Sequence, residues 1–574
     1  MPKKPASGSP SLAKASDHRS GSAGKGFRAV ISRRHIAHAT RLLLLVAFLL
    51  AGLPAVADTP QSRLGKIDFP TSGLEHAQGH FLRGVLALHS FWYEEALTAF
   101  RESTRADPDF MMGYWGEAMA HNHPIWEEQD AQAARKALDH IRESAKITPR
   151  ERAYLNAVRL LYGEGDKFAR DQAYAAAMEH LYRDYPEDLE AASFYSLSLL
   201  GTVRPSARGV RRQIQAGAIA MEVSRKNPDH PGAAHYTIHA FDDPDHAILA
   251  LPAARIYAEI APEAHHARHM PAHIFLQLGM WPEAAASNES GWTTSVDWAK
   301  RKGLPINHRD YHSLHWLLYS YLQQGRYKKA QDVLTLKQQD MKEAGDDKRV
   351  TESGYERPVS LLYDEMAGAF VVETQRWDSA AMLWDVPGLR LEDRSKALPI
   401  FIRGLAAAME GRPEADKHLA ALRALGRKRS AKPHSHRGRT EEIMELELNA
   451  ATLSSKGNYV KAIALMKKAT AVDEAMPPPS GPPDTVKPAH ELFGDILLHA
   501  GRPTEAAQQF LTALARHPNR ARSLLGAARA AAKTGDSRGA VIAYSKLLQV
   551  RAQGDAELPE LREARAYVEQ AGTR

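Results

Sequence analysis

A spacing of 34 residues recurs along this chain of 574 residues and limits the folds open to it more than any other feature. Near the C-terminus, three residues return after one period, in the pairs Gly501 and Gly535, Ala506 and Ala540, and Phe510 and Tyr544. Near the N-terminus, the same internal offsets as in the stretch from Gly494 to Pro518 are found in Gly84, Ala96, Phe100 and Pro108. A chain made of one short unit repeated many times folds as a stack of that unit.

The composition of the unit predicts a pair of helices. Ala, Leu, Glu, Arg and Gln dominate and strand-like alternation is scarce. Small residues stand where two helices touch, the aromatic residue fills the hole between units, and proline ends the second helix. These features resemble the tetratricopeptide repeat family, a helix-turn-helix unit with a 34-residue period. The resemblance implies an all-α fold, a right-handed α-solenoid of roughly ten to twelve repeats with a concave face made by the first helix of each pair.

Further units can be placed on small residues in the second helix: Ala216, Ala250, Ala284, Ala330, Ala380 and Ala462. The expected organisation has four parts. A signal peptide with an extended basic region spans 1–57, and a solenoid with histidine-rich central repeats at 230–315 spans 58–475. A Pro-rich break follows at 476–489, and C-terminal repeats occupy 490–574.

Residues 1–57 have the three parts of a secretory signal. Nine Lys or Arg residues precede the apolar run from Leu42 to Leu53, and the small residues of Pro54-Ala55-Val56-Ala57 follow it. The run is about 12 residues long, short for a membrane span of roughly 20. Arg33 and Arg34 resemble part of a twin-arginine signal, so both export routes stay open. We expect cleavage after Ala57 and a periplasmic protein, with membrane attachment only through an uncleaved leader.

The remaining chain carries almost no net charge. Residues 1–41 have a net charge of +8, whereas the whole chain has +7, which leaves −1 for the rest. A body this close to neutral lacks the basic surface typical of nucleic-acid binding, so we expect no nucleic-acid partner. The absence of cysteine excludes disulfides, thiolate metal ligands and a thiol nucleophile.

Histidines concentrate in the central repeats, with eleven of the 27 between residues 230 and 315. His235 and His239 are spaced i, i+4, and so are His269 and His273, so each pair points from one helix face. The two pairs are 34 residues apart, which is one repeat period. Two successive first helices are therefore predicted to present the same pair of imidazoles.

The phase of the repeat places these pairs at the fifth and ninth positions of the first helix. The resemblance implies that these positions line the concave groove, together with the second position, which His266 occupies. Phased on Ala330, the next unit has His312 at the second position and His315 at the fifth. Because neighbouring helix axes lie about 8–10 Å apart, imidazoles from three adjacent units can meet one ion at about 2.0–2.1 Å.

A transition-metal site with nitrogen donors is the resulting hypothesis. Its predicted ligands are His235, His239, His266, His269, His273, His312 and His315. Imidazole is a ligand for zinc, copper or iron. Asp242 and Asp243 are the expected acceptors for the second N–H of a ligand ring, and Tyr236 and Tyr311 are expected in the groove as proton donors or acceptors.

The order of several segments also resembles a family of exported bacterial proteins with many tetratricopeptide repeats, mostly of uncharacterised activity. The matching segments are Tyr114-Trp115-Gly116-Glu117-Ala118, His235-Tyr236-Thr237-Ile238-His239, His269-Met270-Pro271-Ala272-His273-Ile274 and Tyr311-His312-Ser313-Leu314-His315. The resemblance implies that the histidine motifs belong to the design of the family. It implies no reaction.

Three functions remain open at this point. The first is a scaffold that binds a protein, a peptide or a small ligand in its concave groove beside a histidine metal site. The second is a metal-dependent enzyme, of hydrolase or oxidase type, in which the same ion keeps an open coordination position. The third is a plain repeat adaptor with structural histidines. An enzyme would show an enclosed cavity beside the ligands, whereas a binding groove would be open and long.

Overall fold

The structure is a computed structural model, and it describes residues 63–204, 210–351, 355–379, 383, 396–428, 435–477 and 479–572. Residues 60–574 cluster as one compact unit. The predicted signal peptide lies outside the described residues. Among the helices of the described ranges, none combines the length and the apolar character needed to cross a bilayer.

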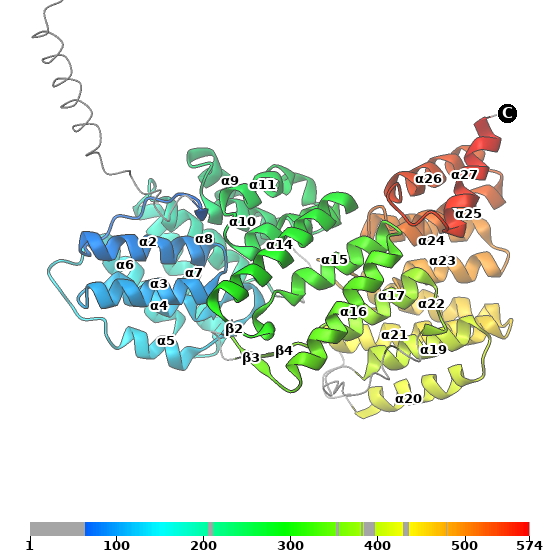
Figure 1. Cartoon of the computed structure of the whole chain (residues 1–574), viewed down its shortest axis with the longest axis horizontal. Helices are drawn as coiled ribbons and strands as arrows, with labels where there is room; N and C mark the ends of the chain where they lie inside the picture. Colours follow the sequence, from blue (N-terminus) through cyan, green and yellow to red (C-terminus); the bar gives the residue numbers. More distant parts are fainter. Residues whose placement is uncertain are drawn as a thin grey trace, which may run out of the picture. The chain divides into compact units, whose positions relative to one another are not determined.

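The N-terminal repeats are antiparallel helix pairs that stack on one another (Figure 1). One short antiparallel hairpin, β1 with β2, interrupts the helices. The elements are α2 (Glu75–His89), α3 (Tyr93–Ala106), α4 (Met111–Ala120), β1 (Asn122–His123), the 3-10 turn η2 (Pro124–Trp126), β2 (Glu128–Gln129), α5 (Ala131–Leu138), α6 (Pro149–Leu161), α7 (Lys167–Asp184), α8 (Leu189–Gly201) and α9 (Arg211–Lys226).

The central repeats continue the stack and contain the histidine-rich window. A second short hairpin, β3 with β4, follows α16. The elements are α10 (Pro231–Ala240), α11 (Ala247–Ile260), α12 (His265–His269), α13 (Pro271–Gln277), α14 (Trp281–Lys302), the 3-10 turn η3 (Ile306–His308), α15 (Tyr311–Gln323), α16 (Tyr327–Ala344), β3 (Lys348–Val350), β4 (Glu356–Pro358) and α17 (Tyr363–Thr374).

The C-terminal repeats are again helix pairs, drawn from yellow to red in Figure 1. Their elements are α19 (Ala397–Met409), α20 (Glu414–Lys428), α21 (His436–Ser455), α22 (Tyr459–Glu474), α23 (Ala489–His499), α24 (Pro503–Arg516), α25 (Ala521–Thr534), α26 (Ser537–Val550) and α27 (Pro559–Gly572). The chain is thus an all-α solenoid of helix pairs, which confirms the predicted fold class.

Small residues and aromatic rings interlock the units as the sequence predicts. Phe100 on α3 lies between two glycines of successive first helices, Gly84 on α2 and Gly116 on α4. A Cβ added at Gly84 would lie 2.6 Å from the Phe100 ring, closer than packed carbon atoms approach. In the C-terminal repeats, Phe510 on α24 likewise lies between two glycines, Gly494 on α23 and Gly526 on α25. One aromatic ring in a two-glycine slot therefore fixes the spacing of first helices in both regions.

The predicted small residues of the second helices are completely buried in the described units. They are Ala96, Ala216, Ala250, Ala284, Ala330, Ala462, Ala506 and Ala540. Each lies on a second helix, where the absence of a long side chain lets the two helices of a pair approach closely. The unit placed on Ala380 falls outside the described residues.

The Pro-rich segment joins α22 to α23 and contacts the central repeats. The Nε2 of Gln277, at the end of α13, donates to the carbonyl of Pro479 over 2.8 Å. A Cβ added at Gly481 would lie 2.8 Å from the Trp316 ring on α15. The segment therefore passes against the first helices of two histidine-bearing repeats.

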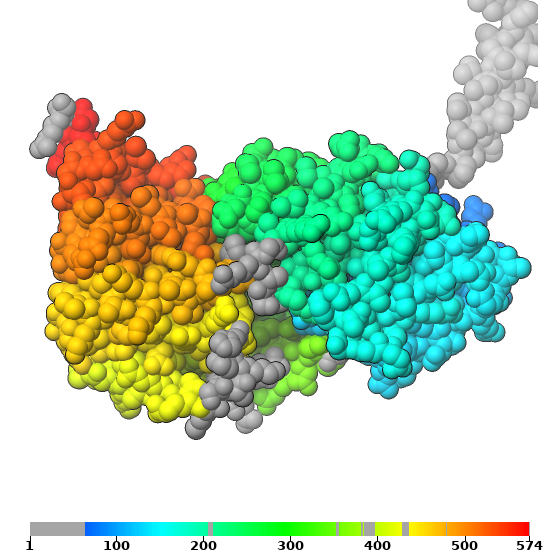
Figure 2. All heavy atoms as spheres, turned by 180° about the vertical axis from the view of Figure 1, so that it is seen from behind, coloured from blue at the N-terminus to red at the C-terminus, as the bar shows by residue number. Residues whose placement is uncertain are grey.

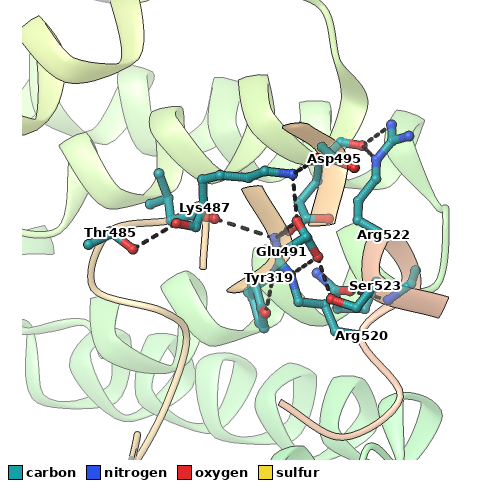
Figure 3. Close-up of polar contacts among 12 residues, drawn as sticks. Tyr319, Thr485, Lys487, Glu491, Asp495, Arg520, Arg522 and Ser523 are labelled. Atoms are coloured by element: carbon teal, nitrogen blue, oxygen red, sulfur yellow. Dashed lines mark hydrogen bonds and ion pairs between the residues drawn. The ribbon is translucent and has the colours of Figure 1, made fainter. Parts of the chain in front are cut away.

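A buried ion-pair network attaches the C-terminal repeats to α15 and α17 (Figure 3). The guanidinium of Arg520 lies 2.8 Å from Glu491, 2.6 Å from Glu373 and 2.7 Å from the Tyr319 hydroxyl, to which it donates. Burial alone would raise the pKa of Glu491, but Arg520 and Lys487 beside it hold that pKa well below its usual range. Residues separated by up to 201 positions in the sequence thus meet in one charged cluster.

Candidate metal centre

The start of α10 fixes the phase of the first histidine pair. His230 is the N-cap residue, and its Nδ1 accepts a hydrogen bond from the backbone N–H of Ala233 in the first turn. Pro231 follows at the first helical position, where its missing N–H costs nothing. His235 and His239 then lie one turn apart, with ring centroids separated by 4.8 Å.

The second pair spans two short helices rather than one. His269 ends α12 and His273 lies in α13, which starts at Pro271 because proline cannot continue the helical hydrogen bonds. Met270 keeps helical dihedral angles between them. The rings of His269 and His273 consequently stay one turn apart, with centroids separated by 5.0 Å.

The first group of ligands, which we name the first triad, consists of His235, His239 and His266. One ring nitrogen of each lies within 4.8 Å of those of the others. The Nδ1 of His235 lies 2.7 Å from the backbone oxygen of His89, so Nδ1 donates and Nε2 keeps its lone pair. The Nε2 atoms of all three rings are buried without a hydrogen-bond partner among the described residues. Buried polar atoms are normally paired, so this group has the donor set for a ligand from outside the chain.

The second triad consists of His269, His273 and His312, and its ring nitrogens also lie within 4.8 Å of one another. The Nδ1 of His273 lies 2.7 Å from a carboxylate oxygen of Asp242. The Nδ1 of His269 lies 2.6 Å from the Oδ1 of Asn288. Both acceptors stand on the outer side of their rings, which is how metal-ligating histidines are usually oriented.

The two inner nitrogens of this triad face each other. Nε2 of His269 and Nε2 of His273 are 3.1 Å apart. The amide of Asn288 is fixed because its Nδ2 donates to the Ala284 carbonyl over 2.8 Å, so Oδ1 must accept from His269. When Asp242 is ionised and accepts from His273 Nδ1–H, the facing nitrogens of the neutral rings both carry lone pairs, and a proton or a metal cation between them is then needed. Two ligands of one tetrahedral ion at about 2.0–2.1 Å lie about 3.3 Å apart, close to this distance.

Burial keeps the imidazoles uncharged. It lowers the pKa of His239 to about 3. The pKa lies well below its ordinary value, for the same reason, in His235, His266, His269 and His273. Burial also lowers the pKa of His312, although this side chain opens into a pocket, and the carboxylates Asp310 and Asp242 oppose that shift. Neutral imidazole is the form that ligates a metal. The lowered pKa of His269 and His273 also disfavours a proton as the bridge between these two rings.

Asp242 and Asp243 have different surroundings. Asp242 contacts the second triad, and burial raises its pKa to about 7. Asp243 instead accepts from the Nδ1 of His246 over 2.8 Å, outside both triads. His315 belongs to neither triad, although it lines the adjoining pocket and burial lowers its pKa to about 3. The seven predicted ligands thus do not converge on one point: six of them form two groups.

The two tyrosines predicted in the groove form hydrogen bonds with residues outside both triads. The Tyr236 hydroxyl lies 2.7 Å from the Nδ1 of His89. The Tyr311 hydroxyl donates to Asp340 over 2.8 Å, and burial together with Asp340 raises its pKa. A phenol that holds its proton this firmly and is already paired is a poor proton carrier for either triad.

Several residues of the site were not predicted. Phe91, in the turn between α2 and α3, stacks against the first triad, with its centroid 4.2 Å from that of His235. Phe91 has a positive φ of 52°. No local signal marks Phe91 or the carbonyl of His89, because both come from a distant repeat. Asn288 offered a signal, since it is a polar residue on the face of α14 that packs against α12.

A pocket of about 540 Å³ adjoins both triads. Its lining includes His239, His266, His273, His312 and Trp316 of the histidine-bearing repeats, together with residues of the Pro-rich segment such as Pro479 and Gly481. In Figure 2 the cyan-to-green and the yellow-to-orange parts of the chain lie beside each other. The side chain of Trp126, from η2, also reaches the pocket and is 45% exposed.

A third cluster of ligand-type groups is a hydrogen-bonded support rather than a metal site. His89 and His230 place their Nε2 atoms 2.6 Å and 3.0 Å from the two oxygens of Glu190. Burial opposes ionisation of Glu190, but the two histidines outweigh it and lower its pKa to about 2. The remaining nitrogens are also paired, with Tyr236 and with a backbone amide. This network holds α2 against α10 and so positions the carbonyl that orients His235.

No protein-family model matches the chain, and no curated protein is similar to it in sequence. Among solved structures it is similar to the Cut9-Hcn1 hetero-tetramer of the APC/C, with 10% identity, a TM-score of 0.30, and coverage of 93% of this chain and 82% of the other. It is also similar to a tetratricopeptide repeat protein from Parabacteroides merdae, with 13% identity, a TM-score of 0.29, and coverage of 54% and 98%. For human IFIT1 with m7Gppp-AAAA, the identity is 14%, the TM-score 0.31, and the coverage 85% and 92%.

At these identities and TM-scores the likeness carries no argument about the partner or the reaction of this chain. The RNA in the IFIT1 structure belongs to that protein. The expectation that this chain has no nucleic-acid partner stays a prediction.

Proposed function

We propose that this protein is an exported helical-repeat protein that holds a transition-metal centre in its concave pocket and uses it to bind a small ligand. The observation that carries the proposal is the state of the imidazole nitrogens. Three buried Nε2 atoms have no partner in the described chain, and two further Nε2 atoms face each other at 3.1 Å. Neutral histidines arranged in this way are a strong donor set for a cation.

The donor chemistry favours zinc, copper or iron. All six donors of the triads are imidazoles, and the chain has no cysteine to supply a thiolate. Hard cations such as calcium and magnesium prefer oxygen ligands, which are absent from both triads. Among divalent ions of the first transition row, such a nitrogen site has the highest affinity for copper, followed by its neighbours in the series.

The pocket supports a small ligand rather than a long peptide. Its volume of about 540 Å³ lies within the range of small-molecule sites, about 300–1,000 Å³. The Pro-rich segment closes one side of it, so the space beside the histidines is not an open channel along the solenoid. A bound metal with three protein ligands would keep a position for such a molecule.

An enzymatic role is the second candidate, and the same pocket favours it. Three protein ligands with an open fourth position are the arrangement of catalytic rather than structural zinc sites. A metal there would supply Lewis acidity or an activated water. In that reaction the chain would hold the imidazoles neutral, orient them through Asp242 and Asn288, and shield the pocket with the Pro-rich segment.

A purely structural role for the histidines explains fewer of the observed ring-nitrogen contacts. A histidine that only packs a repeat interface would be expected to satisfy both ring nitrogens, as His89 and His230 do. The Nε2 atoms of His235, His239 and His266 do not satisfy this condition.

The first test is the metal content of the full chain, purified without a histidine tag from its own compartment. Elemental analysis should find at least about one ion per chain, and the double substitution His239→Ala with His273→Ala should lose it. His246→Ala is the matched control, because this histidine pairs with Asp243 away from the triads and should keep the metal. Less than about 0.1 ion per chain in the unmodified protein would overturn the proposal.

Export rests on the sequence of residues 1–57, which lie outside the described residues. The basic flank, apolar run and small residues before Asp58 support a cleaved signal peptide. Mass spectrometry of the mature protein should find Asp58 as its first residue, and an intact leader would contradict cleavage.

A further inference from the structure

The two triads are one site built twice by the repeat. The corresponding residues are His235 and His269, His239 and His273, and His266 and His312. In each triad, two ligands come from the first helix of one unit and the third comes from the second position of the first helix that follows. The sites therefore lie at successive interfaces, between α10 and α12–α13 and between α12–α13 and α15.

The ring geometry repeats together with the sequence. In the first triad the centroids of His235 and His239, of His235 and His266, and of His239 and His266 are 4.8, 5.0 and 6.5 Å apart. In the second triad the corresponding distances are 5.0, 4.7 and 6.1 Å. Unrelated packing histidines would have no reason to reproduce three distances within 0.4 Å, whereas two copies of one coordination site would.

The leading ligand of each triad is also oriented in the same way. His235 donates its Nδ1–H to the carbonyl of His89, and His269 donates its Nδ1–H to the amide oxygen of Asn288. The acceptors differ in kind and come from different elements. Their common effect is to leave Nε2 of both rings available as the ligand atom.

The triads are direct neighbours. The rings of His239 and His273 are 5.9 Å apart between centroids, and those of His266 and His269 are 6.0 Å apart. These separations between triads are shorter than the longest separation within the first triad. Ligands of the two triads therefore pack directly against one another, which is the arrangement that a two-metal centre with one bridging ligand requires.

We propose that the pocket holds two divalent transition-metal ions side by side, one in each triad, joined by an anionic oxygen ligand. This inference rests on the proposed metal-binding function. Six neutral imidazoles bring no charge to balance two dications. Asp242 lies 2.7 Å from His273 and Asp310 lies 3.4 Å from His265, and these two carboxylates together supply at most two negative charges. A bridging hydroxide, or a ligand with a carboxylate or other oxyanion group, would offset part of the positive charge that remains.

The repeat also explains why the series stops at two. The next unit has His315 at the fifth position, but the ninth position is Tyr319, whose hydroxyl accepts from Arg520. In the preceding first helix, α8, the fifth position is Ser193 and the ninth is Leu197, and neither side chain supplies an imidazole. A third triad of the same kind is therefore not formed at either end.

Metal stoichiometry separates two ions from one. The full chain is stripped with a chelator, loaded with Cu²⁺ and desalted, and copper is counted by mass spectrometry. We expect about two ions per chain, about one in His239→Ala, about one in His273→Ala, and two in the control His246→Ala. One ion in the unmodified chain that either substitution abolishes would overturn the two-ion centre and leave the proposed function standing. No binding at all would overturn both.

Electron paramagnetic resonance of the same samples tests whether the two ions are paired. Two bridged Cu²⁺ ions couple magnetically, so the signal of the loaded chain should account for clearly less copper than mass spectrometry counts. In His273→Ala the remaining ion is alone, and its signal should account for all of the copper. A full signal from both ions of the unmodified chain would overturn the bridged pair. The unmodified chain alone decides this point, so it does not depend on how well the variants fold.

Discussion

In His235 and His269, the hydrogen-bond partner of Nδ1 determines whether Nε2 carries a proton or a lone pair. Where an oxygen that only accepts stands beside Nδ1, as Asn288 does for His269, the proton must lie on Nδ1 and Nε2 is left for a metal. The sequence predicted the i, i+4 pairs and Asp242 as an acceptor candidate, because these follow from one helix period and one short turn. It could not predict the carbonyl of His89, because that contact joins residues 146 positions apart.

The substitution Asn288→Ala tests this at residue scale. It removes the acceptor of His269 Nδ1–H, so the ring can adopt the other tautomer and turn away. Loss of such an outer contact typically lowers metal affinity about 10–100-fold. We expect this loss at the site that contains His269 and none at the site that contains His235, measured by competition with a chelator of known affinity.

Ser287→Ala is the control for this substitution. Ser287 precedes Asn288 on α14, and its hydroxyl donates to backbone carbonyls of α12 rather than to an imidazole. Its removal should leave both affinities unchanged. Equal losses in Ser287→Ala and Asn288→Ala would show that the effect comes from the packing of α14 and not from the orientation of His269.

At the scale of helices, the spacing of small and aromatic residues was the pattern from which the packing of the helix pairs could be predicted. The glycine and phenylalanine offsets placed Gly84 against Phe100, and the alanine positions identified the second helices. The division of the histidine helix at Pro271 could not be inferred from the same pattern. Neither could the course of the Pro-rich segment against Trp316, since its contacts depend on how distant repeats are arranged.

Two glycines of α2 test the interlocking directly. Gly84→Ala forces a methyl group to within 2.6 Å of the Phe100 ring, whereas Gly79→Ala meets nothing within 4 Å. Overpacking of this kind costs about 1–3 kcal/mol. An alanine at an open helical position is favourable by up to about 1 kcal/mol. Thermal unfolding followed by circular dichroism should show a lower midpoint for Gly84→Ala and an equal or higher midpoint for Gly79→Ala. Equal effects of both changes would contradict the slot.

At the scale of the molecule, contacts between distant repeats set this chain apart from a simple linear array. In a solenoid each unit ordinarily contacts only its neighbours, so the sequence of one unit predicts its surroundings. Here Trp298 on α14 donates to Glu95 on α3 over 3.1 Å, and His89 on α2 reaches Tyr236 on α10. Such contacts depend on the accumulated twist of many units, which a 34-residue period does not specify. The histidine pocket lies among these long-range contacts, and its walls could therefore not be predicted.

The Arg520 network is the charged attachment between the C-terminal repeats and α15 and α17, so its loss should weaken that attachment. Arg520→Met leaves the carboxylates Glu373 and Glu491 buried without the guanidinium, and breaking a buried pair in this way costs about 3–5 kcal/mol. The matched control is Arg529→Met, whose pair with Glu563 is partly exposed and contributes at most about 1 kcal/mol. Chemical denaturation followed by circular dichroism should show an early transition in Arg520→Met as α23–α27 separate, and a single transition near that of the unmodified chain in Arg529→Met. If the two variants unfold alike, the network does not hold the C-terminal repeats in place.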